Sequence, residues 1–293
     1  MKNYLRFHLL FVTLLLVVFS SCKKEKDQPE DNNNNNLPTL NVFGCLPQLR
    51  LQADANPRES WEYSPAFPGV LENYKIYNTT TDLVQESYRF TYQYNAALNQ
   101  ALVDSIFFYF GDYQQGQPFY EAKKFHYDFL TPTEYNIIGA DVYANDAGFP
   151  SAKGAWYFDF TNEGLVEVAE YIDDTITAYG TITDNVRITY FYNDDEAVTS
   201  ISTYNHNNVL VAEDTYVPSN YYWPSTWWGI VHPQLNWGMR YAPLMGTYYA
   251  QGFGTQTYEY QYQVNADDYI LESSWLNGTT PVFTGLYTWE CYE

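Results

Sequence analysis

Basic side chains are scarce in this chain. Its 293 residues include 14 Lys and Arg against 35 Asp and Glu, which gives a formal net charge of −21 at pH 7. Proteins that bind nucleic acid neutralise phosphates with Lys and Arg, so this composition argues against a nucleic-acid partner. The same negative charge helps to keep an aromatic-rich chain in solution.

Sequence motifs that carry catalytic chemistry are also missing. The chain has no G-x-S-x-G elbow, H-E-x-x-H pair, P-loop or G-x-G-x-x-G fingerprint. Three histidines follow residue 21. His126 lies in a strand-like alternation and His206 in a polar stretch, so both are expected at the surface, whereas His232 is a candidate for ligand contact. We therefore predict no catalytic residue, no cofactor and no metal site.

The sequence has only one long apolar run, at residues 9–19, and this run is interrupted only by Thr13. A transmembrane helix needs about 20 apolar residues, so this run is too short to span a bilayer. It follows Lys2 and Arg6 and ends in Ser20 and Ser21. A basic start, an apolar middle and a small-residue end are the layout of a secretory signal peptide.

The residues Phe19-Ser20-Ser21-Cys22 resemble a bacterial lipobox. That family prefers Leu where Phe19 stands. The resemblance implies that Cys22 is lipidated, becomes the mature N-terminus and attaches the protein to a membrane. The alternative is an ordinary cleaved signal peptide followed by an incidental cysteine.

Three regions follow from these observations. Residues 1–21 are the leader, and residues 22–36, which are charged and then all asparagine from 32 to 36, form a tether that cannot bury apolar area. Residues 37–293 form a single β domain. Lys24-Glu25-Lys26-Asp27 is partly similar to the acidic export signals of Bacteroidota lipoproteins. We predict an outer-membrane lipoprotein of the cell envelope, with the surface and periplasmic faces both open.

Cysteines are few, and two remain beyond Cys22. Cys45 and Cys291 stand near the two ends of the β domain. In an oxidising compartment they can form a disulfide. In the chain-entropy model, this cross-link would stabilise the folded state by about 5 kcal/mol. Two buried free thiols are the alternative, because spacing alone does not show that the residues meet.

Aromatic residues are abundant: 31 Tyr, 18 Phe and 8 Trp make up 19% of the chain. Many of them alternate with polar residues, as expected for half-buried strands. Little of the mature chain has helical periodicity. The last aromatic residues of successive strands are spaced by about 33 residues or twice that distance: Tyr94, Tyr127, Phe160, Tyr192 and Tyr262.

A turn and a second strand follow each aromatic strand, so each repeat is predicted to be one β-hairpin. The segment Phe160-Thr161-Asn162-Glu163-Gly164-Leu165-Val166 resembles the YD-type hairpin repeat, which also appears in Bacteroidota lipoproteins of unknown function. Other units have acids where that repeat has the turn glycine. We predict an all-β fold, an antiparallel sheet of stacked hairpins of about 33 residues, open or curled. A sandwich or a propeller are alternatives.

Residues 218–249 interrupt the repeat. This aromatic insertion contains half of all the tryptophans and also Pro224, Pro233 and Pro243, which argue against a central strand and for a long loop. Its flat rings are suited to stacking on sugars. The candidate ligand-binding residues are Trp223, Trp227, Trp228, His232, Trp237 and Tyr241. The alternative is a plug that covers one face of the sheet.

Acidic pairs recur at predicted turns: Asp173-Asp174, Asp194-Asp195-Glu196 and Asp267-Asp268. Calcium prefers clustered oxygen ligands, but none of these runs has EF-hand spacing, so we interpret them as solvated turns. The leading functional hypothesis is a non-catalytic binding module of the cell envelope, with a glycan as its ligand. A structural or protein-interaction subunit is the second, and a glycan hydrolase with a hidden carboxylate pair is the third.

Overall fold

The computed structural model describes residues 45–52, 56–67, 69–97, 100–132, 134–146, 149–161, 165–173, 185–222, 241–277 and 279–291. These residues form sixteen strands. In chain order they are β1 (Cys45–Leu51), β2 (Pro57–Tyr63), β3 (Leu71–Tyr77), β4 (Val84–Asn95), β5 (Gln100–Phe110), β6 (Glu121–Thr131), β7 (Glu134–Asp146), β8 (Phe149–Phe160), β9 (Val166–Asp173), β10 (Val186–Tyr192), β11 (Val198–Asn205), β12 (Leu210–Tyr222), β13 (Tyr241–Ala250), β14 (Gly254–Val264), β15 (Ile270–Asn277) and β16 (Thr280–Cys291).

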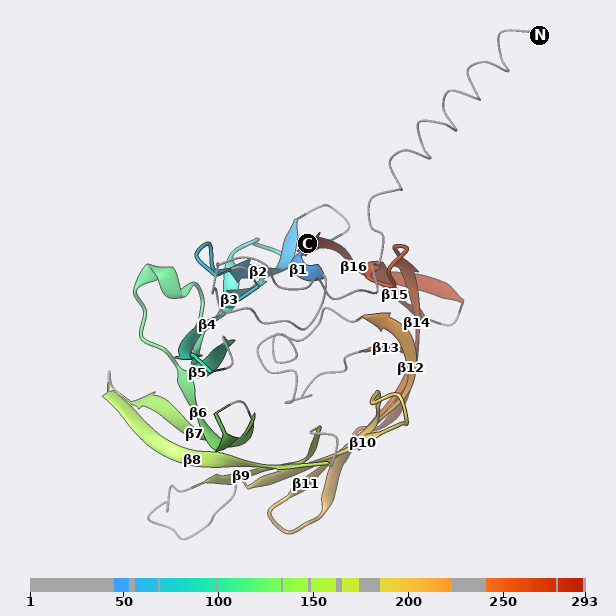
Figure 1. Cartoon of the computed structure of the whole chain (residues 1–293). Helices are drawn as coiled ribbons and strands as arrows, with labels where there is room; N and C mark the ends of the chain where they lie inside the picture. The colour runs from blue at the N-terminus through green and yellow to red at the C-terminus, as the bar shows by residue number, and fades with distance from the viewer. Residues whose placement is uncertain are drawn as a thin grey trace, which may run out of the picture.

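The strands form one closed antiparallel barrel in which each strand pairs with its neighbours in sequence. The ring closes where β1 pairs with β16, with Cys45 opposite Cys291 (Figure 1). The prediction of an all-β antiparallel fold is confirmed, whereas the open or curled sheet was wrong, as were the sandwich and propeller alternatives. Alternation predicts strands and hairpins, but it does not determine whether the last strand returns to the first.

Strands such as β6, β10 and β14 have a more buried face and a more exposed face. On the buried face, aromatic rings form a ladder across neighbouring strands: Trp61 and Tyr74 have ring centroids 5.4 Å apart, Tyr74 and Tyr88 5.8 Å, and Tyr88 and Phe108 5.1 Å. The alternate positions are largely polar. Burial of the aromatic face is therefore the main stabilising contribution of this wall of the barrel.

The polar face is the outer face of the barrel. Residues 111–120 connect β5 to β6, and this connection lies outside the ring of strands (Figure 1). It contacts Ser87, whose neighbours Tyr88 and Glu86 in β4 face the opposite side. The aromatic ladder therefore lines the inside of the barrel.

A tyrosine hydroxyl or an indole N–H connects the two strands of most hairpin pairs. Each donates to a backbone carbonyl of the preceding strand: Tyr63 to Pro47 (2.9 Å), Tyr92 to Leu71, Tyr127 to Val103 (2.6 Å), Tyr192 to Val166 (2.6 Å), Tyr262 to Pro243 (2.7 Å) and Trp289 to Ile270 (2.7 Å). The equivalent residue of β8 is Phe160, which has no hydroxyl. In β4 it is Tyr92 and not Tyr94, so the alignment of the repeat differs there by two residues.

Two of the three predicted acidic turns are built on an asparagine, whereas Asp173 is the last residue of β9 and Asp174 lies outside the described residues. Asn193 Oδ1 accepts hydrogen bonds from the backbone N–H groups of Asp195 and Ala197, and Asn265 does the same for Asp267 and Tyr269. The fourth residue of each turn has positive φ, 60° at Glu196 and 65° at Asp268. An acidic residue thus occupies the left-handed position that glycine adopts at lower cost.

The aromatic insertion is not one loop. Its ends belong to strands β12 and β13, which continue through Pro218 and Pro243. These two prolines pair with each other at a register shift, and a bulge tolerates the missing N–H of proline. The prediction of a loop over all of residues 218–249 was therefore wrong for both ends, and residues 223–240 lie outside the described part of the chain.

Helix is scarce in the described residues, as predicted. It is limited to one short 3₁₀ turn, η1 (Tyr113–Gln115), between β5 and β6. In the same part of the chain, no helix has the length and apolar character needed to cross a membrane.

Candidate functional site

Most of the candidate residues from the sequence lie outside the described residues: Cys22, Trp223, Trp227, Trp228, His232 and Trp237. Tyr241 begins β13 and packs in an aromatic cluster beside the seam where the barrel closes. Its ring centroid is 5.7 Å from that of Tyr222, which stacks on Tyr269 at 5.1 Å. Tyr269 in turn packs against Trp289 at 4.9 Å. The structure thus places Tyr241 among rings that pack on one another.

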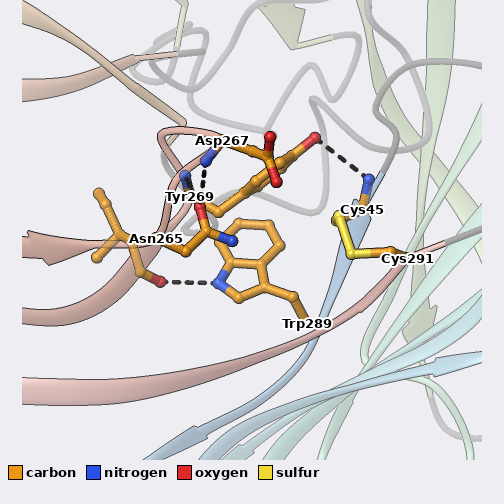
Figure 2. Close-up of a disulfide and its surroundings, with 7 residues drawn as sticks. Cys45, Asn265, Asp267, Tyr269, Trp289 and Cys291 are labelled. Atoms are coloured by element: carbon orange, nitrogen blue, oxygen red, sulfur yellow. Dashed lines mark hydrogen bonds between the residues drawn. A yellow bond between two sulfur atoms is a disulfide. The ribbon is translucent and has the colours of Figure 1, made fainter. Parts of the chain in front are cut away.

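Figure 2 shows the seam itself, where Cys45 and Cys291 form a disulfide. Of the two alternatives for these cysteines, a disulfide or two free thiols, the structure contains the disulfide. The Tyr269 hydroxyl accepts a hydrogen bond from the Cys45 backbone N–H at 3.2 Å, and Trp289 Nε1 donates to the Ile270 carbonyl (Figure 2). The seam is therefore a cross-linked and hydrogen-bonded closure.

A pocket of about 700 Å³ lies elsewhere, between the β2–β3 connection and strands β3 to β5. β4 extends beyond the start of β3, because Asn73, the third residue of β3, pairs with Arg89, the sixth of β4. Only two residues of β3 precede Asn73, whereas six residues of β4 follow Arg89, so the end of β4 extends past β3 and the β2–β3 connection folds beside it. Its lining includes Phe67, Glu72, Asn73, Arg89, Tyr94 and Tyr113.

One wall of the pocket is the β2–β3 connection. The backbone N–H of Ser64 donates to the Val70 carbonyl at 2.7 Å, and that of Val70 donates to Phe67 at 3.1 Å. Gly69 has φ of 80°, a conformation that favours glycine. This tight connection leaves the Phe67 ring 40% exposed at the pocket.

The opposite wall is η1, which is held against the outer face of β4. The fully buried Ser87 hydroxyl donates to the Gly111 carbonyl at 2.6 Å and accepts from the Tyr113 backbone N–H at 3.1 Å. Asp112 caps η1 by accepting from the Gln114 N–H. These bonds fix the backbone of Tyr113, whose ring lines the pocket.

A buried lysine joins this wall to the sheet. Lys75 Nζ lies 2.9 Å from Glu62 Oε1 and 3.9 Å from Asp112 Oδ2, with 7% of its side chain exposed. Burial alone would lower the pKa of Lys75, but the hydrogen bond and the charge of Glu62, together with the charge of Asp112, raise it. Lys75 is thus held charged between β2 and η1.

The pocket contains one positive and one negative side chain. Arg89 interacts with the Tyr109 hydroxyl, and burial raises the pKa of Tyr109 although the Arg89 charge opposes this. Glu72 lies near the Tyr92 hydroxyl, whose pKa is raised by burial and then by that carboxylate. Among the described residues, neither Arg89 nor Glu72 forms an ion pair.

Two observations in the described part of the chain concern metal binding and acid–base chemistry. No group of three or more His, Cys, Asp or Glu residues is placed there to hold a metal ion. Burial raises the pKa of Asp214, partly opposed by a hydrogen bond from Tyr216.

The pocket was not predicted from the sequence. Its residues come from four separate segments, and its position depends on the offset between β3 and β4. The available signal was the connection at residues 111–120, which contains Gly111 and Gly116, both with positive φ. This connection indicates that the chain leaves the sheet between β5 and β6, but it does not show which surface the connection covers.

No protein-family model matches this chain, and no curated protein matches it. Among solved structures it is similar to a porin-like protein from Bacteroides vulgatus ATCC 8482, with 12% identity, 83% of this chain and 98% of that chain covered, and a TM-score of 0.40. A porin-like protein from Bacteroides uniformis ATCC 8492 has 11% identity, coverage of 87% and 99%, and a TM-score of 0.35. At this level of similarity, function has to be argued from the residues of this chain.

Proposed function

We propose that this chain is a non-catalytic, lipid-anchored binding protein of the cell envelope, and that its pocket binds a glycan. The observation that carries the proposal is the pocket, whose lining includes the aromatic side chains of Phe67, Tyr94 and Tyr113 together with Arg89. Its volume is within the range of small-ligand sites, about 300–1,000 Å³. Aromatic rings offer apolar area for the faces of sugar rings, and the polar side chains offer partners for hydroxyl groups.

The outer face of the barrel supports attachment through a lipid. A membrane-spanning barrel presents an apolar band to the bilayer. Here the outward positions carry exposed charged side chains on several strands: Arg89, Lys124, Glu170, Arg187 and Glu259. The proposed attachment of this barrel to a membrane is through a lipid on the lipobox-like Cys22.

Two tyrosines provide the test. Tyr94, at the pocket, and Tyr157, on β8, are each 53% exposed. We expect Tyr94→Ala to weaken binding of the recognised oligosaccharide by roughly tenfold or more, since an aromatic anchor is lost. Tyr157→Ala is the matched control and should leave the affinity unchanged. Isothermal titration of the mature chain measures both, and equal affinities for the two variants would refute the pocket as the site.

The aromatic insertion remains a second candidate location for the glycan. It predicts that Trp227→Ala or Trp228→Ala abolishes binding without unfolding the domain. Unchanged affinity in these folded variants would leave the insertion as a structural cover. The alternative of a protein-interaction subunit loses one of its supports, because closure of the ring pairs both edges of every described strand. Docking would then have to use the outer face.

A further inference from the structure

We infer that the pocket selects an uncharged sugar, one whose hydroxyl groups bind Arg89 on one side of the pocket and Glu72 on the other. This inference rests on the proposed glycan-binding function and specifies its ligand class. The two side chains are the charged groups of the pocket lining, and their charges cancel. A neutral sugar uses both, because each of its hydroxyl groups can accept from a guanidinium and donate to a carboxylate.

The positions of the two groups suit a ligand that reaches across the pocket. Glu72 is close to the Tyr92 hydroxyl, which bonds to the Leu71 carbonyl at the start of β3. Arg89 lies next to Tyr109, and Tyr109 packs against Tyr113 at 5.8 Å between ring centroids. The negative group is therefore on the Tyr92 side of the lining, and the positive group is on the η1 side.

The neighbouring charges argue against an acidic sugar. Lys75, the other cation beside η1, is already engaged by Glu62 and Asp112. A carboxylate on the ligand would gain from Arg89 but would be repelled by Glu72 in the same lining. It would also have to approach a chain with a net charge of −21. An uncharged ligand avoids both costs.

Matched oligosaccharides test this directly. Oligogalacturonate and α-1,4-linked galacto-oligosaccharides of the same length differ in whether each ring carries a carboxylate or a neutral hydroxymethyl group, and manno-, cello- and malto-oligosaccharides extend the neutral set. With the mature chain we expect saturable binding of at least one neutral sugar and none of oligogalacturonate. Because the ligand is uncharged, its affinity should change less than about twofold between 20 and 500 mM NaCl.

Two neutralising variants complete the experiment. Glu72→Gln and Arg89→Gln should each weaken binding of the neutral sugar by roughly ten- to a hundredfold, as expected for a lost charge-assisted hydrogen bond. Glu170→Gln and Arg187→Gln are the controls, because these residues pair across β9 and β10, away from the pocket lining. Each control should change the affinity less than about twofold.

The outcomes separate the two proposals. Tighter binding of oligogalacturonate, or an affinity that falls steeply with salt, would overturn the neutral ligand, while loss of that binding in Tyr94→Ala would still support a glycan site at the pocket. Unchanged affinity in both Glu72→Gln and Arg89→Gln would also overturn the inference. If no sugar of either class binds the folded chain, the proposed function fails and the inference fails with it.

Discussion

On the inner face, a single side-chain donor satisfies a buried backbone carbonyl of the preceding strand. Val166 is fully buried, and its carbonyl accepts from the Tyr192 hydroxyl at 2.6 Å. Tyr192→Phe would leave that acceptor without this partner. We expect the free energy of unfolding to fall by about 1–2 kcal/mol, measured by urea denaturation.

The control for this prediction is Tyr157→Phe on the exposed outer face, which should change stability by less than about 0.5 kcal/mol. Equal effects at the two positions would contradict the role of the Tyr192 hydroxyl. Phe160, in the equivalent place on β8, shows that the ring alone suffices in one repeat. The hydroxyl therefore adds stability to a position that aromatic packing already defines.

A second prediction for a single residue concerns backbone strain at the turn after β10. Glu196 has φ of 60°, a conformation that side chains with a Cβ adopt at a cost. Glu196→Gly should therefore be more stable than Glu196→Ala by about 1 kcal/mol in urea denaturation.

At Glu167, which lies in β9, the order should reverse, with Ala more stable than Gly by about 0.5–1 kcal/mol. The same order at both positions would show that the turn conformation does not decide the outcome. The sequence identified this turn by its asparagine and its acids. It did not show which residue takes the left-handed conformation, because the hydrogen bonds of the folded turn determine that.

At the scale of elements, one buried lysine connects η1 to the sheet. Lys75→Met would leave Glu62 and Asp112 without their shared cation. We expect a loss of about 1–3 kcal/mol, since Glu62 is partly exposed and water screens part of the interaction. We also expect faster hydrogen exchange at the Tyr113 amide, because η1 is held less firmly.

Lys124→Met, at an exposed position of β6, is the control and should leave both measurements close to wild type. Slow exchange at Tyr113 in Lys75→Met would mean that the Ser87 hydrogen bonds alone hold this wall. This distinction concerns the pocket directly, because Tyr113 forms part of its lining.

The elements themselves were only partly predictable. The alternation of aromatic and polar residues correctly predicted strands at Tyr94, Tyr127, Phe160, Tyr192 and Tyr262, which lie in β4, β6, β8, β10 and β14. The same reasoning treated Pro218 and Pro243 as loop residues. It failed there because a bulge in the paired strands accommodates prolines, and pairing between distant strands is not visible in local sequence.

At the scale of the whole molecule, the disulfide closes the ring between its first and last strands. The two cysteines are separated by 246 positions in sequence. The double variant Cys45→Ala, Cys291→Ala should be less stable by about 5 kcal/mol if the chain-entropy model holds. Urea denaturation with and without reductant measures this, and the reductant should destabilise the wild type but not the double variant. An unchanged wild-type midpoint would contradict the prediction.

Alkaline pH should also destabilise the barrel as a whole. Burial, the largest cause in each case, raises the pKa above 10 for tyrosines on the inner face: Tyr88, Tyr127, Tyr190, Tyr192 and Tyr262. In the unfolded chain these phenols ionise near pH 10, whereas in the folded chain they keep their protons. Their contribution is therefore complete below pH 10 and is lost as pH rises above it.

Each such tyrosine should reduce the free energy of unfolding by about 1.4 kcal/mol per pH unit above 10. Urea denaturation between pH 8 and 11, combined with phenolate absorbance, measures the effect. Lys75 acts in the same direction, because its raised pKa adds stability that is present below the unfolded pKa and is lost as pH rises through the folded one. A stability that stays constant up to pH 11 would contradict this reading of the inner face.

The all-β class, the hairpin repeat and the aromatic face of the alternating strands could be read from the amino-acid sequence, because they depend on local alternation and turn residues. The folded barrel was needed to show that the sheet closes, that Cys45 meets Cys291, and that Phe67, Arg89 and Tyr113 line one pocket. Those features depend on pairing between residues far apart in the chain and on the offset between neighbouring strands. Both are set by the packing of the whole barrel, which no single segment of the sequence encodes.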